Sequence, residues 1–468
     1  MLGRAGEAIL GGKGDVTATG FVGDSLDSTH DPELQSWVDS ANGHVDFPIQ
    51  NLPFGVFEPI DRAARGSSGS RGGIRIGDEI LDLAALSRTE LLTGAAQVAA
   101  TAADAASLNG LFELGPEHRK DLRQQVSALL TVGAKQQAAL EALLCPVGDA
   151  ALSLPAVVGD YTDFYAGIHH ATAVGSLFRP DNPLLPNYKW VPVAYHGRAS
   201  TVQPSGRPFH RPNGQVKTPD DPAPTYRPSD RVDFELELGI WIGAKNSPGQ
   251  PIPIGRAAEH VAGYCLLNDW STRDVQAWEY QPLGPFLSKS FATSVSTWVI
   301  TPEALAPYRI PLSARPVGDP DPLPYLRDEH DQRCGGLDFD LEVLIATRAM
   351  RDKAVPAQRL SLSSTRHLYW SVAQLIAHHT SGGCNLRPGD LIGSGTISAP
   401  HPDGCGSMLE LTHGGAEPVS LPTGETRTYL LDGDEITLRA RAARPGVAPV
   451  GLGECRAVVQ PALSMIAR

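Results

Sequence analysis

The sequence predicts a β-rich, mixed α+β protein with two domains, and three observations lead to this fold class. From about residue 156 onward, short β-type runs alternate with Pro and Gly, including seven prolines between Pro204 and Pro228. Before that point, an Ala- and Leu-rich window over residues 87–144 has the spacing of helices. Neither standard spacing of a Gly-rich phosphate loop occurs, which argues against a nucleotide-binding doubly wound sheet.

The composition is typical of an acidic globular protein that acts on a small molecule. The chain of 468 residues has a net charge of -13, which disfavours nucleic-acid and anionic-membrane partners. Its six cysteines include no C-x-x-C pair, as expected in a reducing cytoplasm. The sequence contains no run of 18 apolar residues, and acidic residues near its start disfavour a signal or transit peptide. We therefore expect a cytoplasmic protein without membrane partners.

Changes in composition divide the chain into three segments. Residues 1–44 mix Gly, Asp, Thr and Ser with little periodicity and are predicted to form a disordered or irregular extension. Residues 45–155 form a first small domain, in which residues 74–83 indicate two strands joined by a Gly-Asp turn and the Ala-rich window supplies helices. Residues 156–468 form the second, larger domain.

One short segment of the larger domain places carboxylates in a pattern suited to a metal ion. Residues 233–238 alternate acidic and apolar side chains, so in a strand Asp233, Glu235 and Glu237 share one face. Carboxylate oxygens are the ligands that hard cations prefer. The alternative is a half-buried strand with an acidic solvent face, and this segment alone does not decide between the two.

A second segment, residues 159–179, adds further side chains of catalytic type. It contains Asp163 and Tyr165, the pair His169-His170, and Arg179. An imidazole titrates near neutral pH and a guanidinium suits carboxylate recognition. A single His is more often structural than catalytic, and chemistry alone does not rank the two histidines.

A third segment carries a helix with a polar face. From residue 271 onward the spacing predicts a helix on which Arg273, Gln276 and Tyr280 share one face. Asp269 precedes the helix, where it either caps the helix or has another function. Lys289 lies in an apolar context, which suggests a function, a carboxylate partner, or both.

Two late features add to these candidates. Residues 385–398 form a turn and a Gly-rich strand end that contains Thr396, where backbone can approach a ligand closely. Glu410 is an acid within an apolar strand, either on its outer face or buried beside a basic group. The adjacent His378 and His379 diverge in regular structure, so we interpret them as structural.

Seven collinear motifs make the chain resemble the fumarylacetoacetase family. The resemblance extends from about residue 46 to the end of the chain. It implies a small N-terminal SH3-like β-barrel domain, a larger β-roll or sandwich catalytic domain, and a homodimer. The motifs are GDYTDFY (159–165), YHGRAS (195–200), ELE (235–237), NDWS (268–271), PLGPFL (282–287), NLRPGDLIGSGTIS (385–398) and LDGDE (431–435).

The resemblance also implies the activity and its cofactors. The expected reaction is hydrolysis of the C–C bond of 4-fumarylacetoacetate to fumarate and acetoacetate, the last step of tyrosine and phenylalanine catabolism. The implied cofactor is Ca²⁺ or Mg²⁺, with Mn²⁺ as a further candidate, and no organic cofactor is expected. The implied metal ligands are Asp163, Glu235, Glu237 and Asp269, and a second Mg²⁺ is implied near Asp269, Lys289 and Thr293.

The same resemblance assigns roles in catalysis and substrate binding. His170 is implied as the general base and Glu410 as the acid that orients it. The contacts to the oxyanion and the leaving group fall on Arg273, Gln276 and Lys289. Substrate contacts fall on Tyr165, Arg179, Tyr195, Gln276, Tyr280 and Thr396.

Three residues depart from the family pattern, and a fourth has no role in it. Ser288, Ala292 and Thr297 replace the commoner Gly, Gly and Pro, and Asp233 has no ligand role, so it is expected at the surface or just outside the site.

An acylpyruvate hydrolase or 2-oxo acid decarboxylase of the wider superfamily would share the acidic set, but the small domain, Arg179 and Tyr195 favour a fumarylacetoacetase. A catalytically inactive metal-binding or assembly protein is disfavoured because the implied catalytic residues are intact.

Overall fold

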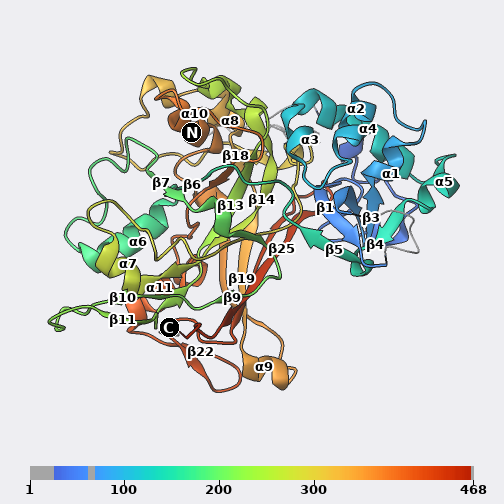
Figure 1. Cartoon of the computed structure of the whole chain (residues 1–468). Helices are drawn as coiled ribbons and strands as arrows, with labels where there is room; N and C mark the ends of the chain where they lie inside the picture. Colours follow the sequence, from blue (N-terminus) through green and yellow to red (C-terminus); the bar gives the residue numbers. More distant parts are fainter. Residues whose placement is uncertain (1–25, 62–68, 465–468) are drawn as a thin grey trace, which may run out of the picture.

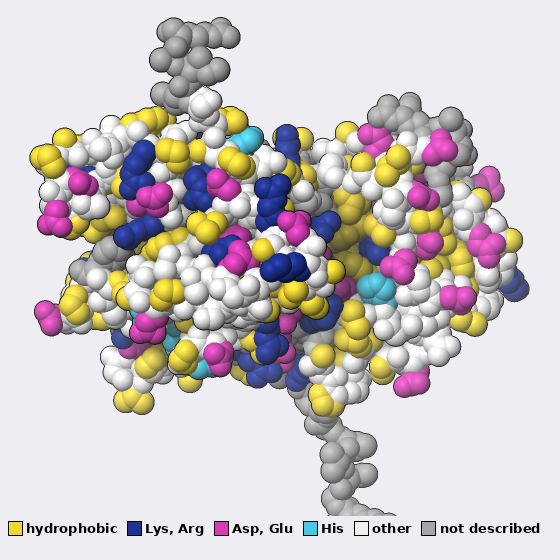
Figure 2. Space-filling model, turned by 90° about the horizontal axis from the view of Figure 1, so that it is seen from below, with side chains coloured by type: hydrophobic (Ala, Val, Ile, Leu, Met, Phe, Trp, Pro, Cys, Tyr) yellow, Lys and Arg dark blue, Asp and Glu magenta, His cyan; other side chains and the backbone are white. Residues whose placement is uncertain are grey.

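The computed structural model describes residues 26–61 and 69–464, which form two parts (Figure 1). A small N-terminal part, drawn in blue and teal, lies beside a larger part that contains the longest strands. On the face shown in Figure 2, Asp and Glu side chains are mixed with Lys and Arg side chains over the larger part, whereas Asp and Glu predominate over the small part. Within the described residues, no helix is both long and apolar enough to span a membrane. The predicted β-rich fold class with a small first domain is confirmed.

A five-stranded antiparallel sheet in the order β4-β3-β2-β1-β5 forms the small part, consistent with a small SH3-like barrel. The predicted turn at Gly77-Asp78 joins β2 to β3, and Gly77 has a φ of 54°, which glycine adopts without strain. The strands are β1 (Phe54–Pro59), β2 (Arg71–Ile76), β3 (Glu79–Asp82), β4 (Leu144–Pro146) and β5 (Ala150–Ser153).

Helices between β3 and β4 cover this sheet, as the Ala-rich window predicts (Figure 1). On the longest of them, Leu122, Val126 and Leu130 are fully buried, and Pro116 occupies the first helical position, where its fixed φ suits the helix. The helices are α1 (Leu83–Ser87), α2 (Gly94–Ala102), α3 (Asn109–Glu113), α4 (Pro116–Leu130) and α5 (Gln137–Glu141).

The predicted extension over residues 1–44 is folded in its second half, while residues 1–25 lie outside the described residues. Residues 26–44 contain two short 3-10 helices, Ser28–His30 and Asp39–Ala41. Ser36 Oγ donates to the carbonyl of Leu130 at 2.8 Å, and Trp37 Nε1 donates to that of Leu129 at 2.9 Å. These contacts attach residues 26–44 to the end of α4, so the segment belongs to the small part.

Two sheets form the larger part and share one apolar core. A mixed seven-stranded sheet has the order β7-β6-β21-β13-β14-β16-β8, and a five-stranded sheet has the order β20-β19-β24-β25-β9. Ile240 and Leu266 of the first sheet and Leu341 and Leu438 of the second belong to the same buried cluster. The strands are β6 (Tyr161–Phe164), β7 (Ala194–Gly197), β8 (Val202–Pro204), β13 (Leu236–Ile242), β14 (Val261–Asp269), β16 (Thr293–Val295) and β21 (Leu391–Gly393), then β9 (Phe209–His210), β19 (Asp340–Ala346), β20 (Gln358–Ser364), β24 (Glu435–Ala442) and β25 (Val450–Gln460).

Shorter elements surround these sheets. The helices are α6 (Ile168–Phe178), α7 (Arg273–Glu279), α8 (Glu329–Cys334), α9 (Arg348–Asp352), α10 (Val372–Thr380) and α11 (Met408–Leu411). The two-stranded pairs are β10 (Asn213–Val216) with β11 (Thr225–Pro228), β12 (Val232–Asp233) with β15 (Ser271–Thr272), β17 (Arg309–Ile310) with β18 (Gly336–Leu337), and β22 (Val419–Ser420) with β23 (Thr426–Arg427).

The small part packs against one end of the seven-stranded sheet. Val56 and Ile74 of the small part share a buried apolar cluster with Trp241 of β13. Trp241 lies on the same face of β13 as Glu237, because side chains four residues apart in a strand point the same way. The small part therefore covers one end of this face, and the acidic end carries the site described next.

Candidate active site

Four carboxylates meet at one end of the seven-stranded sheet. Asp163 lies on β6, Glu237 on β13, Asp269 at the end of β14, and Glu235 just before β13. One oxygen of each lies within 4.8 Å of the others, and all four side chains are buried. We call these residues the acidic cluster. The structure thus brings together the four residues implied as metal ligands.

Gly393 on β21 allows two of these carboxylates to meet. Strand β21 lies between β6 and β13, and Gly393 is paired with Asp163 in the register. A Cβ on Gly393 would lie 2.4 Å from Asp163 Oδ1 and 2.9 Å from Glu237 Oε2, so a side chain here would displace at least one of these carboxylates. The backbone N–H of Gly395 also donates to Glu237 Oε2 at 3.0 Å. The Gly-rich strand end therefore accommodates and orients the acidic cluster.

The acidic cluster fits a hard divalent cation. Asp163 Oδ1 and Glu237 Oε1 are buried and have no hydrogen-bond partner within the described residues. Burial, reinforced by the neighbouring carboxylates, raises the pKa of Asp163 and of Glu237 well above its ordinary value. A cation such as Ca²⁺ or Mg²⁺ takes carboxylate oxygens as ligands and offsets their mutual repulsion.

Two buried cationic side chains contact the acidic cluster. Lys289 Nζ contacts Glu235 and lies 2.6 Å from Asp269 Oδ2, and Arg273 Nη1 lies 2.8 Å from Glu235 Oε1. Burial raises the pKa of Glu235, but Lys289 and Arg273 outweigh this effect and lower it to about 2. Lys289 therefore has the carboxylate partners that its apolar sequence context suggested.

Asp269 is a component of the cluster and does not cap α7. The residue that precedes α7 is Thr272, and Asp269 instead accepts a hydrogen bond from the hydroxyl of Tyr195 at 2.7 Å. The hydroxyl of Thr293 lies 3.3 Å from Asp269 Oδ1. The structure thus brings Asp269, Lys289 and Thr293 together, and the second Mg²⁺ there stays a prediction.

A His–Glu pair borders the same region. His170 on α6 and Glu410 on α11 are both buried, and His170 Nδ1 lies 2.7 Å from Glu410 Oε2. Burial acts to raise the pKa of Glu410, but His170 and the hydroxyls of Ser407 and Ser398 outweigh it, so the pKa is lowered. A carboxylate at Nδ1 places the proton on that nitrogen, so Nε2 is the nitrogen that can accept a proton.

A cavity of about 420 Å³ connects these groups. Asp163 and Glu235 of the acidic cluster line it, together with His170 and Lys289. Except for Glu410, which contacts His170 from outside the cavity, the remaining residues implied as catalytic or substrate contacts line it as well, namely Tyr165, Arg179, Tyr195, Arg273, Gln276, Tyr280 and Thr396. The predicted polar face of α7 points into this cavity, whose size suits a small organic molecule.

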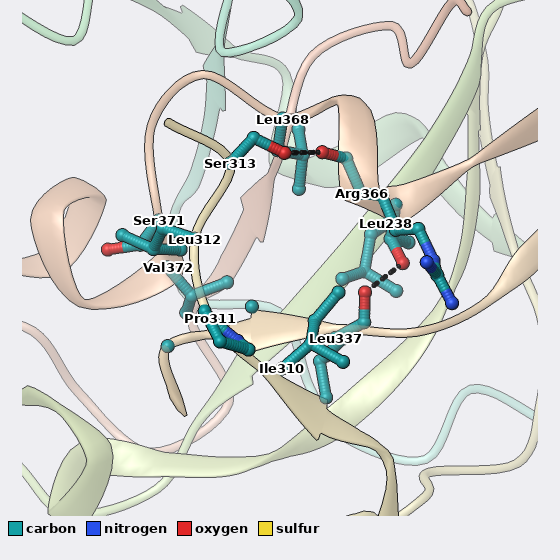
Figure 3. A pocket seen from close by; sticks show the side chains of 13 residues that line it. Leu238, Ile310, Pro311, Leu312, Ser313, Leu337, Arg366, Leu368, Ser371 and Val372 are labelled. Carbon is teal, nitrogen blue, oxygen red and sulfur yellow. Dashed lines mark hydrogen bonds between the residues drawn. The ribbon is translucent and has the colours of Figure 1, made fainter. Parts of the chain in front are cut away.

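A second cavity, on the other face of β13, is too small for a comparable ligand (Figure 3). Its volume is about 20 Å³, and Leu238 and Leu337 are among the apolar side chains around it. Leu238 follows Glu237 in the strand, so the predicted alternation places one side chain toward the cluster and the next into the apolar core.

Models of two domains of one family match the chain. The model described as Fumarylacetoacetase N-terminal matches residues 50–155, and the model described as Fumarylacetoacetate (FAA) hydrolase C-terminal matches residues 161–460. The chain belongs to the fumarylacetoacetate hydrolase family. The two matched segments cover both parts of the fold and include every residue of the acidic cluster and of the His–Glu pair.

Fumarylacetoacetases of three animals are similar to the chain over most of its length. The Homo sapiens protein is 44% identical over 426 residues, which cover 89% of this chain and 97% of that protein. The Rattus norvegicus protein is 42% identical over 425 residues, with 90% and 97% covered. The Caenorhabditis elegans protein is 44% identical over 438 residues, with 92% and 100% covered. The family predicted from the seven motifs is therefore confirmed.

The structure corrects one sequence interpretation near this family's site and decides between two alternatives for another residue. Glu410 was expected in an apolar strand but lies in the short helix α11, where Ser407 caps the helix and its hydroxyl donates to Glu410 Oε2 at 2.7 Å. For Asp233 the surface position is excluded and the position just outside the site is confirmed, because its side chain is completely buried beside Arg273. Its acidic side chain satisfies neighbouring donors, so it does not need solvent.

Sequence reasoning alone did not single out Ser398, Ser407 or Gly393. Both serines donate to Glu410, and Gly393 leaves room for the carboxylates of Asp163 and Glu237 on the two neighbouring strands. Ser398 and Gly393 lie in the Gly-rich motif at 385–398, and this motif is the sequence feature that could have indicated them. The histidine pair at 378–379 is structural in the described chain: His379 bonds to Thr162 at 2.9 Å, outside the cavity.

Proposed function

We propose that this chain hydrolyses the C–C bond of 4-fumarylacetoacetate to give fumarate and acetoacetate, as a hydrolase acting on C–C bonds in ketonic substances. Its similarity to fumarylacetoacetases over about nine-tenths of its length supports this activity. The observation that carries the proposal is a cavity lined by His170, by the buried cations Arg273 and Lys289, and by Asp163 and Glu235 of the acidic cluster. Glu410 holds His170 from outside this cavity.

His170 is positioned to act as the general base. With Nδ1 held by Glu410, Nε2 takes a proton from a water molecule, whose oxygen bonds to the carbonyl carbon on the fumaryl side. The C–C bond then breaks, and its electron pair stays on the acetoacetate carbon as an enolate. The imidazolium returns the proton to that carbon, which regenerates neutral His170 and completes the hydrolysis.

Arg273, Gln276 and Lys289 stabilise the negative charge that develops during this reaction. All three line the cavity, and Arg273 Nη2 is buried without a hydrogen-bond partner within the described residues. Preorganised donors of this kind lower the barrier because they need little rearrangement in the transition state. A Ca²⁺ or Mg²⁺ ion held by the acidic cluster, or Mn²⁺ in its place, would supply Lewis-acid stabilisation of the enolate charge.

The purified protein, loaded with Ca²⁺, Mg²⁺ or Mn²⁺, is expected to consume 4-fumarylacetoacetate, followed as loss of substrate absorbance. Chelation should abolish turnover and refilling with a divalent ion should restore it, because the acidic cluster alone repels the enolate. Comparison of the three ions identifies the best cofactor. Metal-loaded protein that leaves the absorbance unchanged would contradict the proposal, and a preference for short acylpyruvates would indicate an acylpyruvate hydrolase instead.

Replacement of Arg179 by Met is expected to raise KM by about 10–100-fold. This is the loss of affinity expected when one charge-assisted hydrogen bond to a substrate carboxylate is removed. Arg179 lines the cavity, and its Nε is buried without a hydrogen-bond partner in the described part of the chain. Steady-state kinetics check this, with kcat expected to change much less than KM. Arg207→Met is the control, since Arg207 is exposed and lies outside the cavity. Equal KM values for all three proteins would exclude the assigned contact.

The homodimer implied by the family resemblance and the cytoplasmic location expected from the composition stay predictions. The roles of individual site residues also stay predictions, and they are supported by the position of these residues around one cavity. The small-molecule substrate follows from the proposed reaction, and the chemistry requires water but no organic cofactor.

A further inference from the structure

We propose that Asp233 is a positioning residue that sets Arg273 and Glu410 relative to each other, an inference that rests on the proposed function. Asp233 ends β12, does not line the cavity and is not part of the acidic cluster. Its side chain is nevertheless fully buried and contacts both Arg273 and the backbone of α11, the helix that carries Glu410. Asp233 acts through its neighbours and does not touch the substrate.

Both oxygens of Asp233 are engaged. Oδ2 accepts a hydrogen bond from Arg273 Nε at 2.8 Å and one from the backbone N–H of Leu409 at 3.0 Å. Oδ1 accepts a third from the backbone N–H of Met408 at 2.6 Å. One carboxylate thus joins the guanidinium of Arg273 to the first two residues of α11.

The contact to α11 controls the position of Glu410. The helix spans only Met408–Leu411, so a helix of this length does not hold its place without tertiary contacts. Asp233 satisfies two N–H groups that would otherwise lack partners at the helix start. Glu410, one residue further along, holds His170 Nδ1 at 2.7 Å. A shift of α11 therefore changes the orientation of the general base.

The contact to Arg273 controls the direction of the guanidinium. With Nε held by Asp233, Nη1 meets Glu235 at 2.8 Å and Gln276 at 3.0 Å. Because the guanidinium is planar, these bonds also fix the direction of Nη2, the nitrogen without a protein partner in the described chain. The same backbone segment reinforces the arrangement, since Asp233 pairs with Ser271 between β12 and β15.

The test compares Asp233→Asn with Asp82→Asn. Asp82 is a matched control in the small part: it is buried, accepts from Arg71 Nε at 2.6 Å and from the N–H of Ala85 at 2.9 Å, at the start of α1. Both substitutions remove a buried carboxylate that joins an arginine to a helix start. They differ in that only Asp233 contacts the catalytic groups.

We expect Asp233→Asn to lower kcat by about 10–100-fold, the effect of displacing a catalytic group by about 1 Å, and to change KM by less than about threefold. Asp82→Asn should keep kcat within about twofold of the wild type even where its melting temperature falls equally. The proposal is overturned by an unchanged kcat in folded Asp233→Asn, or by an equal loss of kcat in Asp82→Asn. All values are ratios to an active wild type, so an inactive wild type would refute the proposed function and not the positioning role.

Two further variants keep the test decisive. Asp233→Glu retains the charge beside Arg273 but moves the carboxylate by one methylene group, so it should also lower kcat by at least about 10-fold; an unchanged kcat overturns the proposal. In an Arg273→Ala background, Asp233→Asn should reduce kcat by a smaller factor than in the wild type, because one of its two targets is gone. Equal factors in the two backgrounds would overturn it.

Discussion

His170→Ala is expected to lower kcat by about 10²–10⁴-fold, the usual contribution of a positioned general base. The imidazole is buried, lines the cavity and is held through Nδ1 by Glu410 at 2.7 Å, so no other group in this arrangement replaces Nε2. His170 has no place in the acidic cluster, so the bound metal should be retained. Steady-state kinetics and metal analysis of the same preparation check both expectations.

The neighbouring histidine provides the control for this prediction. His169 is half-buried, stacks edge-on against His367 and does not line the cavity, so His169→Ala should keep kcat within about twofold of the wild type. Loss of the metal together with activity in His170→Ala would assign His170 a structural role. Loss of activity only in His169→Ala would reverse the assignment of the base.

The sequence predicted correctly which face of its own strand or helix several site residues occupy. Alternation in residues 233–238 separates Glu237 from Leu238, and the structure places these two side chains on opposite faces of β13. Local periodicity reports which face a side chain occupies, since it depends only on the backbone of its own strand. The helical face with Arg273 and Gln276 was predicted for the same reason.

Properties that depend on packing between distant segments were not predictable in this way. The alternation along the strand assigns Asp233 to the same face as the metal-ligand candidates. Its partners are nevertheless Arg273, 40 residues away, and the backbone of α11, 175 residues away. Glu410 lies in a four-residue helix whose apolar sequence equally suits a strand. The close approach of two carboxylates to Gly393 appears only when β6, β21 and β13 are placed side by side.

The electrostatics of the site divide its carboxylates into two groups. Glu235 is paired with Lys289 and Arg273, and its pKa is lowered, whereas burial raises the pKa of Asp163 and of Glu237. The cations therefore compensate one side of the acidic cluster and leave the other side to a metal ion. Substitution on the uncompensated side is the direct test of metal binding, because it leaves Lys289 and Arg273 with their partners.

Glu237→Gln is expected to weaken binding of Ca²⁺ or Mg²⁺ by about 100-fold or more, since even partners outside the first coordination shell contribute about 10–100-fold. The substitution keeps the shape of the side chain and removes the charge. Turnover should fall with metal occupancy. Metal content after desalting measures the loss, and the rise in melting temperature on adding metal, which reports affinity for the folded state, should shrink in parallel.

Asp331→Asn is the matched control for Glu237→Gln. Asp331 is also a buried acid, with its pKa raised to about 6 by burial, but its carboxylate bonds to Ser371 and lies outside the acidic cluster. This variant should bind metal as the wild type does, even if its stability changes. Full metal content and wild-type turnover in Glu237→Gln would show that the buried carboxylates at this end of the sheet do not form the metal site. A bound cation would then no longer explain why four buried acids lie beside only Lys289 and Arg273 in the acidic cluster.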